Sequence, residues 1–374
     1  MLVELHMLQS FSPSNLNRDD TNNPKDCEFG GVRRARISSQ CIKRAIRTCP
    51  EFKRATQVES GTRSRRMMGE RLAKALEAAG KPAEEARQVL NSFVPAYLSK
   101  LDKDGERTSV LLYLSHEELD AIRDALLARW SEVLAGDKAA LDGIAKELTK
   151  RFRLHSSAPD IALFGRMLAE RPELNLEAAC QVAHAISTHR VNMEMDWWTA
   201  VDDLQPDDNS GAGMMGFAAH DSACFYRYAC VHWEQLLATL GDEDLARRTV
   251  EGFARAAIAA VPSGKQNSYA AYCPPSLLLG VVRTDGTAWS LANAFERPVR
   301  PDREGGYVRP SARALDAYWG RLRSIYGDAQ FKAVAVLAAD DGLELPNLAS
   351  ECCRNQEEWL QEILRALGKE GGGQ

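Results

Sequence analysis

Alternating apolar and polar residues predict several strands along the chain. At the N-terminus, Val3, Leu5 and Met7 alternate with polar residues, as in a strand over residues 2–8 with one apolar face. Further strands are predicted at residues 108–114, 224–232, 268–273, 277–283 and 288–291, the last two joined by a tight turn at residues 284–287. Most of the predicted strands therefore lie in the second half of the chain.

Helical periodicity dominates residues 63–152. Ser115 and Glu118 have the spacing of a capping box, which is typical of a helix N-terminus. Two apolar stripes at helical spacing follow: Leu119, Ile122, Leu126, Trp130 and Val133, then Leu141, Ile144, Leu148 and Phe152. We expect this block to be a helical insertion with a small core of its own. Other helices are predicted at residues 41–47, after a cap at Ser38 and Ser39, and at about 176–187, 242–261 and 355–367.

Polar residues with proline and glycine predict two long loops. The first spans residues 10–31, and the second is the acidic, glycine-rich stretch 201–216. Without the second loop and the helical insertion, the order is strand, helix, strands, helix, strands. This order suits an α+β fold with a ferredoxin-like βαββαβ core, the class that includes RNA-recognition modules. The alternative, a doubly wound sheet, needs more alternation of strands and helices than the pattern contains.

Length and composition narrow the class of protein. A chain of 374 residues exceeds the size at which one hydrophobic core usually stops growing, so we expect two domains or one domain with large insertions. No apolar run approaches the ~18 residues of a membrane helix, and we expect no secretory signal. The nine cysteines form no C-x-x-C pair, which favours a reduced, cytoplasmic protein without structural zinc.

The charge is distributed unevenly. The chain has a net charge of −5, but residues 18–66 contain thirteen Lys/Arg against six Asp/Glu, a net of +7, and the remainder carries −12. A basic block on an acidic body is typical of a local phosphate-binding surface. The alternative from charge alone is a solvated basic face.

The basic block contains a predicted helix suited to phosphate. Ser38 and Ser39 at its N-terminus would place N–H groups and hydroxyls where the helix dipole is positive. Lys43, Arg44 and Arg47 follow within two turns, and Lys43 and Arg47 share one face. Cations near a helix N-terminus oppose the dipole, a cost that an anionic ligand would remove. This arrangement favours phosphate binding over a solvated face.

Residues 211–216 read G-A-G-M-M-G and match the G-x-G-x-x-G string. A dinucleotide site needs an apolar strand before this string, but residues 205–210 are polar and acidic, so we reject that interpretation. Met214, Met215 and Phe217 on such a loop suit a wedge between bases or a contact with a partner. The alternative is that the loop folds onto its own core.

Two aromatic pairs flank this loop. Trp197 and Trp198 are adjacent on an extended chain, so they face opposite ways and at most one lies in the core. Tyr226 and Tyr228 lie on one face of a predicted strand, where core packing is favoured over a base-stacking platform.

The sequence contains no evident catalytic or metal-binding set. His184 and His189 are five residues apart, which is not the i, i+4 spacing of a metal-binding helix. The doublets Asp19-Asp20, Asp202-Asp203 and Asp207-Asp208 are typical of solvated loops, because sequence neighbours usually point apart. We predict no catalytic residue, metal or cofactor, although a set assembled in space stays open.

Short segments between residues 10 and 296 resemble, in family order, the CasC-type backbone subunit of the type I-E CRISPR Cascade complex, a member of the RAMP superfamily. They read SNLNRDD at residues 14–20, FGG at 29–31, RRARISSQ at 33–40, DIALFGRM at 160–167, AHAISTH at 183–189, DWWTAVDDL at 196–204, FYRYA at 225–229, GKQ at 264–266 and ANAFE at 292–296. The resemblance is weak across residues 51–150 and past residue 330.

The resemblance implies a hand-like α+β fold with a ferredoxin-like (RRM-like) palm, a helical fingers insertion and a protruding thumb hairpin. The implied boundaries are residues 1–60 for the first part of the palm with the RNA-binding loop and helix, 61–170 for the fingers, 171–190 for a palm helix, 191–223 for the thumb and 224–374 for the second part of the palm with C-terminal helices. Copies would polymerise along a CRISPR RNA and present the guide for pairing with target DNA in antiviral defence.

The resemblance also implies roles for individual residues. RNA-backbone contacts would come from Arg18, Lys25, Ser38, Ser39, Gln40, Lys43, Arg44, Arg47, Arg166 and Lys265. The residues that trap a flipped base with the thumb would be Met167, Trp198, Thr199 and Met215. The implied partners are CRISPR RNA, target DNA through the guide, further copies of the chain, and the Cascade subunits CasA (large), CasB (small), CasD and CasE (repeat endonuclease), with no membrane.

Two alternatives stay open from the sequence. A metal-dependent RNase of the same superfamily would cut target RNA from a loop aspartate, with Asp19, Asp20 or Asp26 as candidates. A helical adaptor would bind only protein. We expect a non-catalytic RNA-binding subunit, because contacts to the sugar–phosphate backbone position a strand without reading its sequence, as a guide holder requires.

Overall fold

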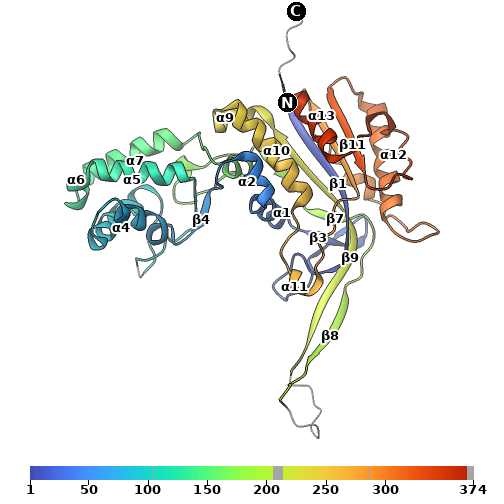
Figure 1. Ribbon diagram of the computed structural model, residues 1–374, viewed down its shortest axis with the longest axis horizontal. Helices are drawn as coiled ribbons and strands as arrows, with labels where there is room; N and C mark the ends of the chain where they lie inside the picture. The colour runs from blue at the N-terminus through green and yellow to red at the C-terminus, as the bar shows by residue number, and fades with distance from the viewer. Residues whose placement is uncertain (104, 205–213, 285, 369–374) are drawn as a thin grey trace, which may run out of the picture. The chain divides into compact units, whose positions relative to one another are not determined.

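The computed structural model describes residues 1–103, 105–204, 214–284 and 286–368, and it divides into two units (Figure 1). Unit 1 comprises Met1–Glu51, Val182–Cys230 and Phe253–Gln374. Unit 2 comprises Phe52–Gln181 and Val231–Gly252. An extended sheet dominates unit 1 and helices dominate unit 2, which confirms the α+β class predicted from the sequence.

The sheet of unit 1 has the strand order β11-β10-β1-β9-β7-β3-β2, and both β6 and β8 pair with β9. The strands are β1 (Leu2–Ser14), β2 (Asp26–Phe29), β3 (Val32–Ile37), β6 (Cys180–Val182), β7 (Ala185–Ser187), β8 (Glu194–Ala200), β9 (Met214–His232), β10 (Leu277–Arg283) and β11 (Phe331–Ala338). β1 pairs with β10 in antiparallel register, with Leu5 opposite Gly280. The long strand β1 is therefore an inner strand of the sheet.

Helices cover both faces of this sheet. On one face, Trp319 of α12 (Val308–Tyr326) belongs to the same buried cluster as Leu279 of β10. On the other face, α13 (Gln356–Leu367) lies so close to Gly280 that a Cβ there would come within 2.3 Å of Ile363. Also in unit 1 are α1 (Ser39–Arg47), the C-terminal part of α10 (Glu243–Ala259), α11 (Gln266–Tyr269) and the 3₁₀ turns η3 (Ala292–Phe295) and η4 (Ala349–Glu351).

The polar residues of β1 are buried because both faces of the sheet are covered. Glu4 forms an ion pair with the Arg283 guanidinium, and it accepts hydrogen bonds from the Tyr228 hydroxyl (2.8 Å) and the Trp289 N–H (2.7 Å). His6 Nδ1 lies 2.9 Å from the Tyr226 hydroxyl, and burial lowers the pKa of His6 to about 3. Both faces of this strand are therefore buried, including the one that carries Glu4 and His6, and core packing of the two tyrosines is confirmed.

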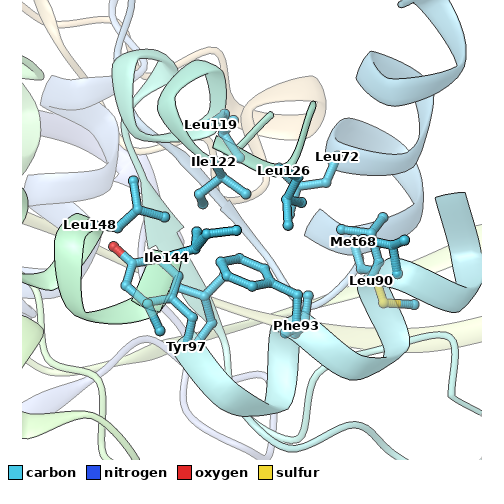
Figure 2. Close-up of a cluster of buried hydrophobic side chains, with 14 of the residues drawn as sticks. Met68, Leu72, Leu90, Phe93, Tyr97, Leu119, Ile122, Leu126, Ile144 and Leu148 are labelled. Carbon is cyan, nitrogen blue, oxygen red and sulfur yellow. The ribbon is translucent and has the colours of Figure 1, made fainter. Parts of the chain in front are cut away.

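Unit 2 contains a helical core of its own. Figure 2 shows its apolar side chains, which come from helices far apart in the sequence and converge on Phe93 and Ile122. Its elements include the C-terminal part of α2 (Pro50–Thr56), β4 (Thr62–Ser64), the π-helix η1 (Met68–Ala73), α3 (Lys74–Ala78), α4 (Ala83–Tyr97), β5 (Leu112–Leu114), α5 (His116–Ala128), α6 (Trp130–Leu134), α7 (Lys138–Phe152), α8 (Pro159–Phe164), the 3₁₀ turn η2 (Pro172–Leu174) and α9 (Trp233–Leu240). The capping box of Ser115 and Glu118 is present, as predicted.

Several local predictions were wrong. The helix expected at 176–187 is replaced by β6 and β7, because pairing with β9 outweighs the helix propensity of an alanine-rich segment. Residues 268–273 are not a strand, since α11 occupies their first part. No described residue of 288–291 is a strand, because β10 pairs with the distant β11 instead. The loop expected at 10–31 is shorter, since β1 runs to Ser14 and β2 starts at Asp26.

Candidate nucleic-acid interface

A groove of about 620 Å³ lies beside α1 in unit 1, and we call it the α1 groove. Its walls are one face of α1, the loop after β1, and the segment that follows α10. The lining residues are Leu16, Asn17, Arg18, Asp19, Asn22, Cys41, Arg44, Ala45, Thr48, Cys49, Pro50, 259–264 and Tyr272. Three separate segments of the chain therefore line one open groove.

The first wall is a loop held in shape by its own side chains. Asp19 accepts hydrogen bonds from the Thr21 N–H (2.9 Å), the Thr21 hydroxyl (2.8 Å) and the Asn23 N–H (2.9 Å). The hydroxyl contact from Thr21 is the largest cause of a lowered pKa at Asp19. Asn15 donates from its amide to the Asn22 carbonyl (2.9 Å) and so closes the loop. This bonding holds the backbone that carries Arg18 at the groove.

The second wall is α1, which begins at the predicted serine cap. Ser38 Oγ accepts from the Cys41 N–H (3.4 Å), and the Ser38 N–H donates to Asn17 Oδ1 (2.8 Å), which ties the helix to the first wall. Ile42 and Ile46 are buried against the sheet. These two residues fix the rotation of the helix, so its polar side chains face outward.

The basic residues of α1 divide into two sets. Arg44 is exposed and lines the groove, whereas Lys43 and Arg47 are half-buried on the neighbouring side of the helix. Gln40 is exposed, and the Ser39 hydroxyl donates to its side-chain Oε1 (3.3 Å). Cys41 adds no negative charge to the groove, because burial raises the pKa of its thiol. The groove side of α1 is therefore cationic through Arg44.

The third wall contains two residues in the left-handed backbone region. Lys265 has φ = 52° and Ala270 has φ = 45°, and they bracket α11. The buried side chain of Gln266 donates to the Pro262 carbonyl (3.0 Å) and accepts from the Ala271 N–H (2.8 Å), which holds this conformation. Left-handed residues other than glycine are strained and persist only where the surroundings fix them.

A second basic strip lies on β2 and β3. Arg33 donates from Nε to Asp26 (2.7 Å), while Arg36 donates to the Asp26 carbonyl (3.1 Å) and lies 3.0 Å from His184 Nδ1. Lys25, half-buried, lines a small cavity with Arg36 and Asp221. Burial, together with the charge of Asp26, raises the pKa of Asp221 to about 7. Burial and the nearby Arg36 lower the pKa of His184.

Arg34 has a structural role that the sequence did not reveal. Its buried guanidinium donates to the carbonyls of Phe29 (3.1 Å), Ser187 (3.0 Å) and Phe295 (2.8 Å). Gly30 is needed beside it, because a Cβ there would lie 1.7 Å from the Glu296 carbonyl oxygen. Three of the segments that carry the family resemblance are therefore joined by one side chain.

Arg166 is not part of an exposed surface. Its side chain is fully buried in unit 2, where it forms an ion pair with Glu118 and donates from Nε to the Leu174 carbonyl (3.0 Å). The predicted RNA contact is therefore replaced by an internal ion pair in this structure. The neighbouring Met167, by contrast, is 81% exposed.

The hairpin of β8 and β9 extends away from the sheet of unit 1 (Figure 1). Trp197 and Trp198 are 56% and 42% exposed, so neither lies in the core, which agrees with the prediction that at most one of them does. Trp198 lies opposite Gly216 and Thr199 opposite Met215, and both Thr199 and Met215 are exposed. Exposed Met214 and Phe217 lie on the same hairpin. Residues 211–213 of the G-x-G-x-x-G string lie outside the described residues, and residues 214–216 belong to β9.

The described residues contain no group of three or more His, Cys, Asp or Glu side chains placed to hold a metal ion. Three aspartates are candidates for an RNase site. Asp19 accepts hydrogen bonds from its own loop, Asp26 forms an ion pair with Arg33, and Asp20 is exposed. Within the part of the chain that the structure describes, no helix combines the length and apolarity needed to cross a bilayer.

Sequence reasoning missed the third wall of the groove. It assigned a role to Lys265 only through the resemblance, and it gave none to Gly264 or Tyr272. The sequence pattern predicted a strand over residues 268–273, and nothing in that pattern separates Tyr272 from other surface residues. Only the fold brings Tyr272 to the same groove as Arg18 and Arg44.

Comparison with known proteins gives strong matches over nearly the whole chain. The model of a family described as CT1975-like protein matches residues 3–363. A chain of a "CRISPR RNA-guided surveillance complex, pre-nicking" is 32% identical with a TM-score of 0.84, and the match covers 98% of this chain and 100% of that one. A chain of a "CRISPR RNA-guided surveillance complex" is 28% identical with a TM-score of 0.76, over 98% and 100% of the two chains. A search of the curated proteins finds no match.

Proposed function

The chain belongs to the family of CT1975-like proteins, and we propose that it is the CasC-type backbone subunit of a type I-E CRISPR Cascade complex, which binds CRISPR RNA without cutting it. The similarity to subunits of two CRISPR RNA-guided surveillance complexes supports membership of such a complex in CRISPR defence. A cytoplasmic location is part of the same proposal.

The α1 groove is the observation that carries the RNA-binding role. Arg18 and Arg44 line it from two different walls, and no ion pair to the Arg44 guanidinium is found among the described residues. Lys43 and Arg47 extend the basic surface along the next side of α1. Cations on a rigid helix and a braced loop suit the phosphates of an extended strand, because phosphate contacts need charge and position but no base readout.

The fold supports the finer assignment of palm, fingers and thumb. The strands β10-β1-β9-β7 have the order 4-1-3-2 when numbered along a βαββαβ motif, with α1 after the first strand and α10 before the last. This order is that of a ferredoxin-like sheet. In the proposal, unit 2 corresponds to the fingers and the β8–β9 hairpin to the thumb.

The hairpin supports the proposal of a polymer along the guide. Its exposed apolar residues, Trp197, Trp198, Met214, Met215 and Phe217, are more than a monomer usually leaves in one place. We propose that they contact a neighbouring copy and the guide RNA, with Trp198, Thr199 and Met215 next to a flipped base. CasA, CasB, CasD and CasE, together with target DNA paired to the guide, are the further proposed partners.

RNA binding and RNA cleavage by the purified chain test this proposal together. We expect the chain to co-purify with RNA when it is produced with its CRISPR RNA, and to leave added single-stranded RNA intact with and without Mg²⁺. Mg²⁺-dependent cleavage that Asp20→Ala abolishes would favour the RNase alternative. A protein that carries no nucleic acid and binds none would favour the adaptor that binds only protein.

A further inference from the structure

Tyr272 is an exposed aromatic residue at a cationic groove. Its side chain is 68% exposed, yet it lines the α1 groove together with Arg18 and Arg44. Its hydroxyl forms no hydrogen bond with any residue that the structure describes, and its ring contacts no other described aromatic ring. Packing within unit 1 therefore does not account for its position.

The backbone before Tyr272 is held in a costly conformation. Ala270, two residues earlier, has φ = 45°, and the Tyr272 N–H donates to its carbonyl in a tight turn (2.8 Å). Ala271 is fully buried, and its N–H is fixed by Gln266 (2.8 Å). A residue other than glycine that is held in the left-handed region is strained, and such strain clusters at binding sites. The fixed backbone holds Tyr272 at the groove.

Tyr272 is the only aromatic residue among the described residues that line the groove. The other lining residues are aliphatic, polar or charged, and they include the cations suited to phosphate. An RNA strand offers a flat base beside every phosphate, and a tyrosine ring binds such a face with little sequence preference.

We propose that Tyr272 stacks on a base of the RNA whose flanking phosphates are bound by Arg18 and Arg44. This inference rests on the proposed RNA-binding function and adds a nucleobase site to it. Because stacking needs a ring but no hydroxyl, phenylalanine is expected to replace tyrosine, whereas alanine is not.

The test compares the binding of single-stranded RNA by the wild-type chain, Tyr272→Ala, Tyr272→Phe and the control Tyr326→Ala. Tyr326 is a matched control, because it is 67% exposed and lies at the end of α12, outside the lining of the groove. We expect Tyr272→Ala to weaken binding about 5- to 100-fold, with the salt dependence unchanged, and the other two variants to bind within about twofold of wild type. A photo-crosslink from RNA containing 4-thiouridine should map to Tyr272.

Three results would overturn the inference. If wild type binds RNA and Tyr272→Ala binds equally well, the stacking role fails while the proposed function stands. If Tyr272→Ala keeps its affinity for RNA but loses association between copies, the residue is a protein contact instead. A wild-type chain that binds no RNA would contradict the proposed function itself, and with it the stacking role.

Discussion

Gly264 packs directly against the main chain of Leu16. A Cβ at position 264 would lie 2.4 Å from the Leu16 carbonyl oxygen and 2.7 Å from that of Asn15. Two walls of the α1 groove therefore meet backbone to backbone, and only glycine permits this approach. The width of the groove depends on this contact, because neither neighbour is a flexible side chain that can move aside.

Replacing Gly264 by alanine is expected to disturb both stability and RNA binding. The added methyl group forces the loop of the first wall away from the segment after α10, which we expect to lower the free energy of unfolding by about 1–3 kcal/mol. Denaturant unfolding and RNA titration measure the two effects. Gly69→Ala, which adds the same methyl group where no atom lies within 4 Å, is the control and should lower neither. A fully stable Gly264→Ala variant with normal RNA affinity would contradict this description of the groove.

Asp221 is expected to make stability depend on pH. Its pKa rises from the ordinary 3.8 to about 7 in the folded chain, mainly through burial. The folded state therefore holds a proton that the unfolded state releases between these values, so the contribution of this group to stability falls as the pH rises from 3.8 to 7.

Asp221→Asn should remove this pH dependence, because its amide carries no charge at any pH. We expect a gain of about 1–3 kcal/mol in the free energy of unfolding at pH 8, a smaller gain as the pH falls below 7, and none near pH 3.5. Denaturant unfolding of both proteins between pH 3.5 and pH 8 measures this gain. Asp341→Asn, at an exposed position, is the control. A gain that does not vary with pH would show that Asp221 is not the titrating group.

Met215→Asp is expected to impair assembly on RNA while leaving a single subunit folded. The side chain is 60% exposed on the hairpin, so a charge there affects stability by only about 0.5 kcal/mol. A buried, unpaired carboxylate in the contact with the next copy would cost far more. Native mass spectrometry of the chain with RNA measures the assembly, and Glu194→Ala on the same hairpin is the control. Normal assembly of Met215→Asp would refute a wedge or contact role for this residue.

The features predictable from the sequence are those encoded by local chemistry. The Ser38 cap is found at the N-terminus of α1, and the capping box of Ser115 and Glu118 is found at that of α5. Both depend on a side chain that bonds to a backbone N–H three residues away. The apolar stripes of the helical insertion are equally local, and they form the core of unit 2 as expected (Figure 2).

The features that the sequence did not reveal depend on distant segments. β6 and β7 form because both strands pair with β9, and the local sequence of residues 180–187 does not indicate that pairing. The buried Arg34 is one arginine in a basic run, and only the carbonyls of Phe29, Ser187 and Phe295 set it apart from exposed Arg33. Arg166 likewise looked like a surface cation until Glu118 was found beside it.

The salt dependence of RNA binding tests the central claim most directly. If the cations of α1 and Arg18 neutralise about four phosphates, the logarithm of the association constant should fall with a slope of about −3 per decade of salt. Replacing Lys43, Arg44 and Arg47 together by alanine should reduce this slope to about −1 and weaken binding equally for RNAs of different sequence. The control is the double variant Arg354→Ala with Arg365→Ala. Arg354 lies just before α13 and Arg365 lies within it. This variant should keep the wild-type slope. A triple variant whose slope equals that of wild type would contradict the assignment of the α1 surface to RNA.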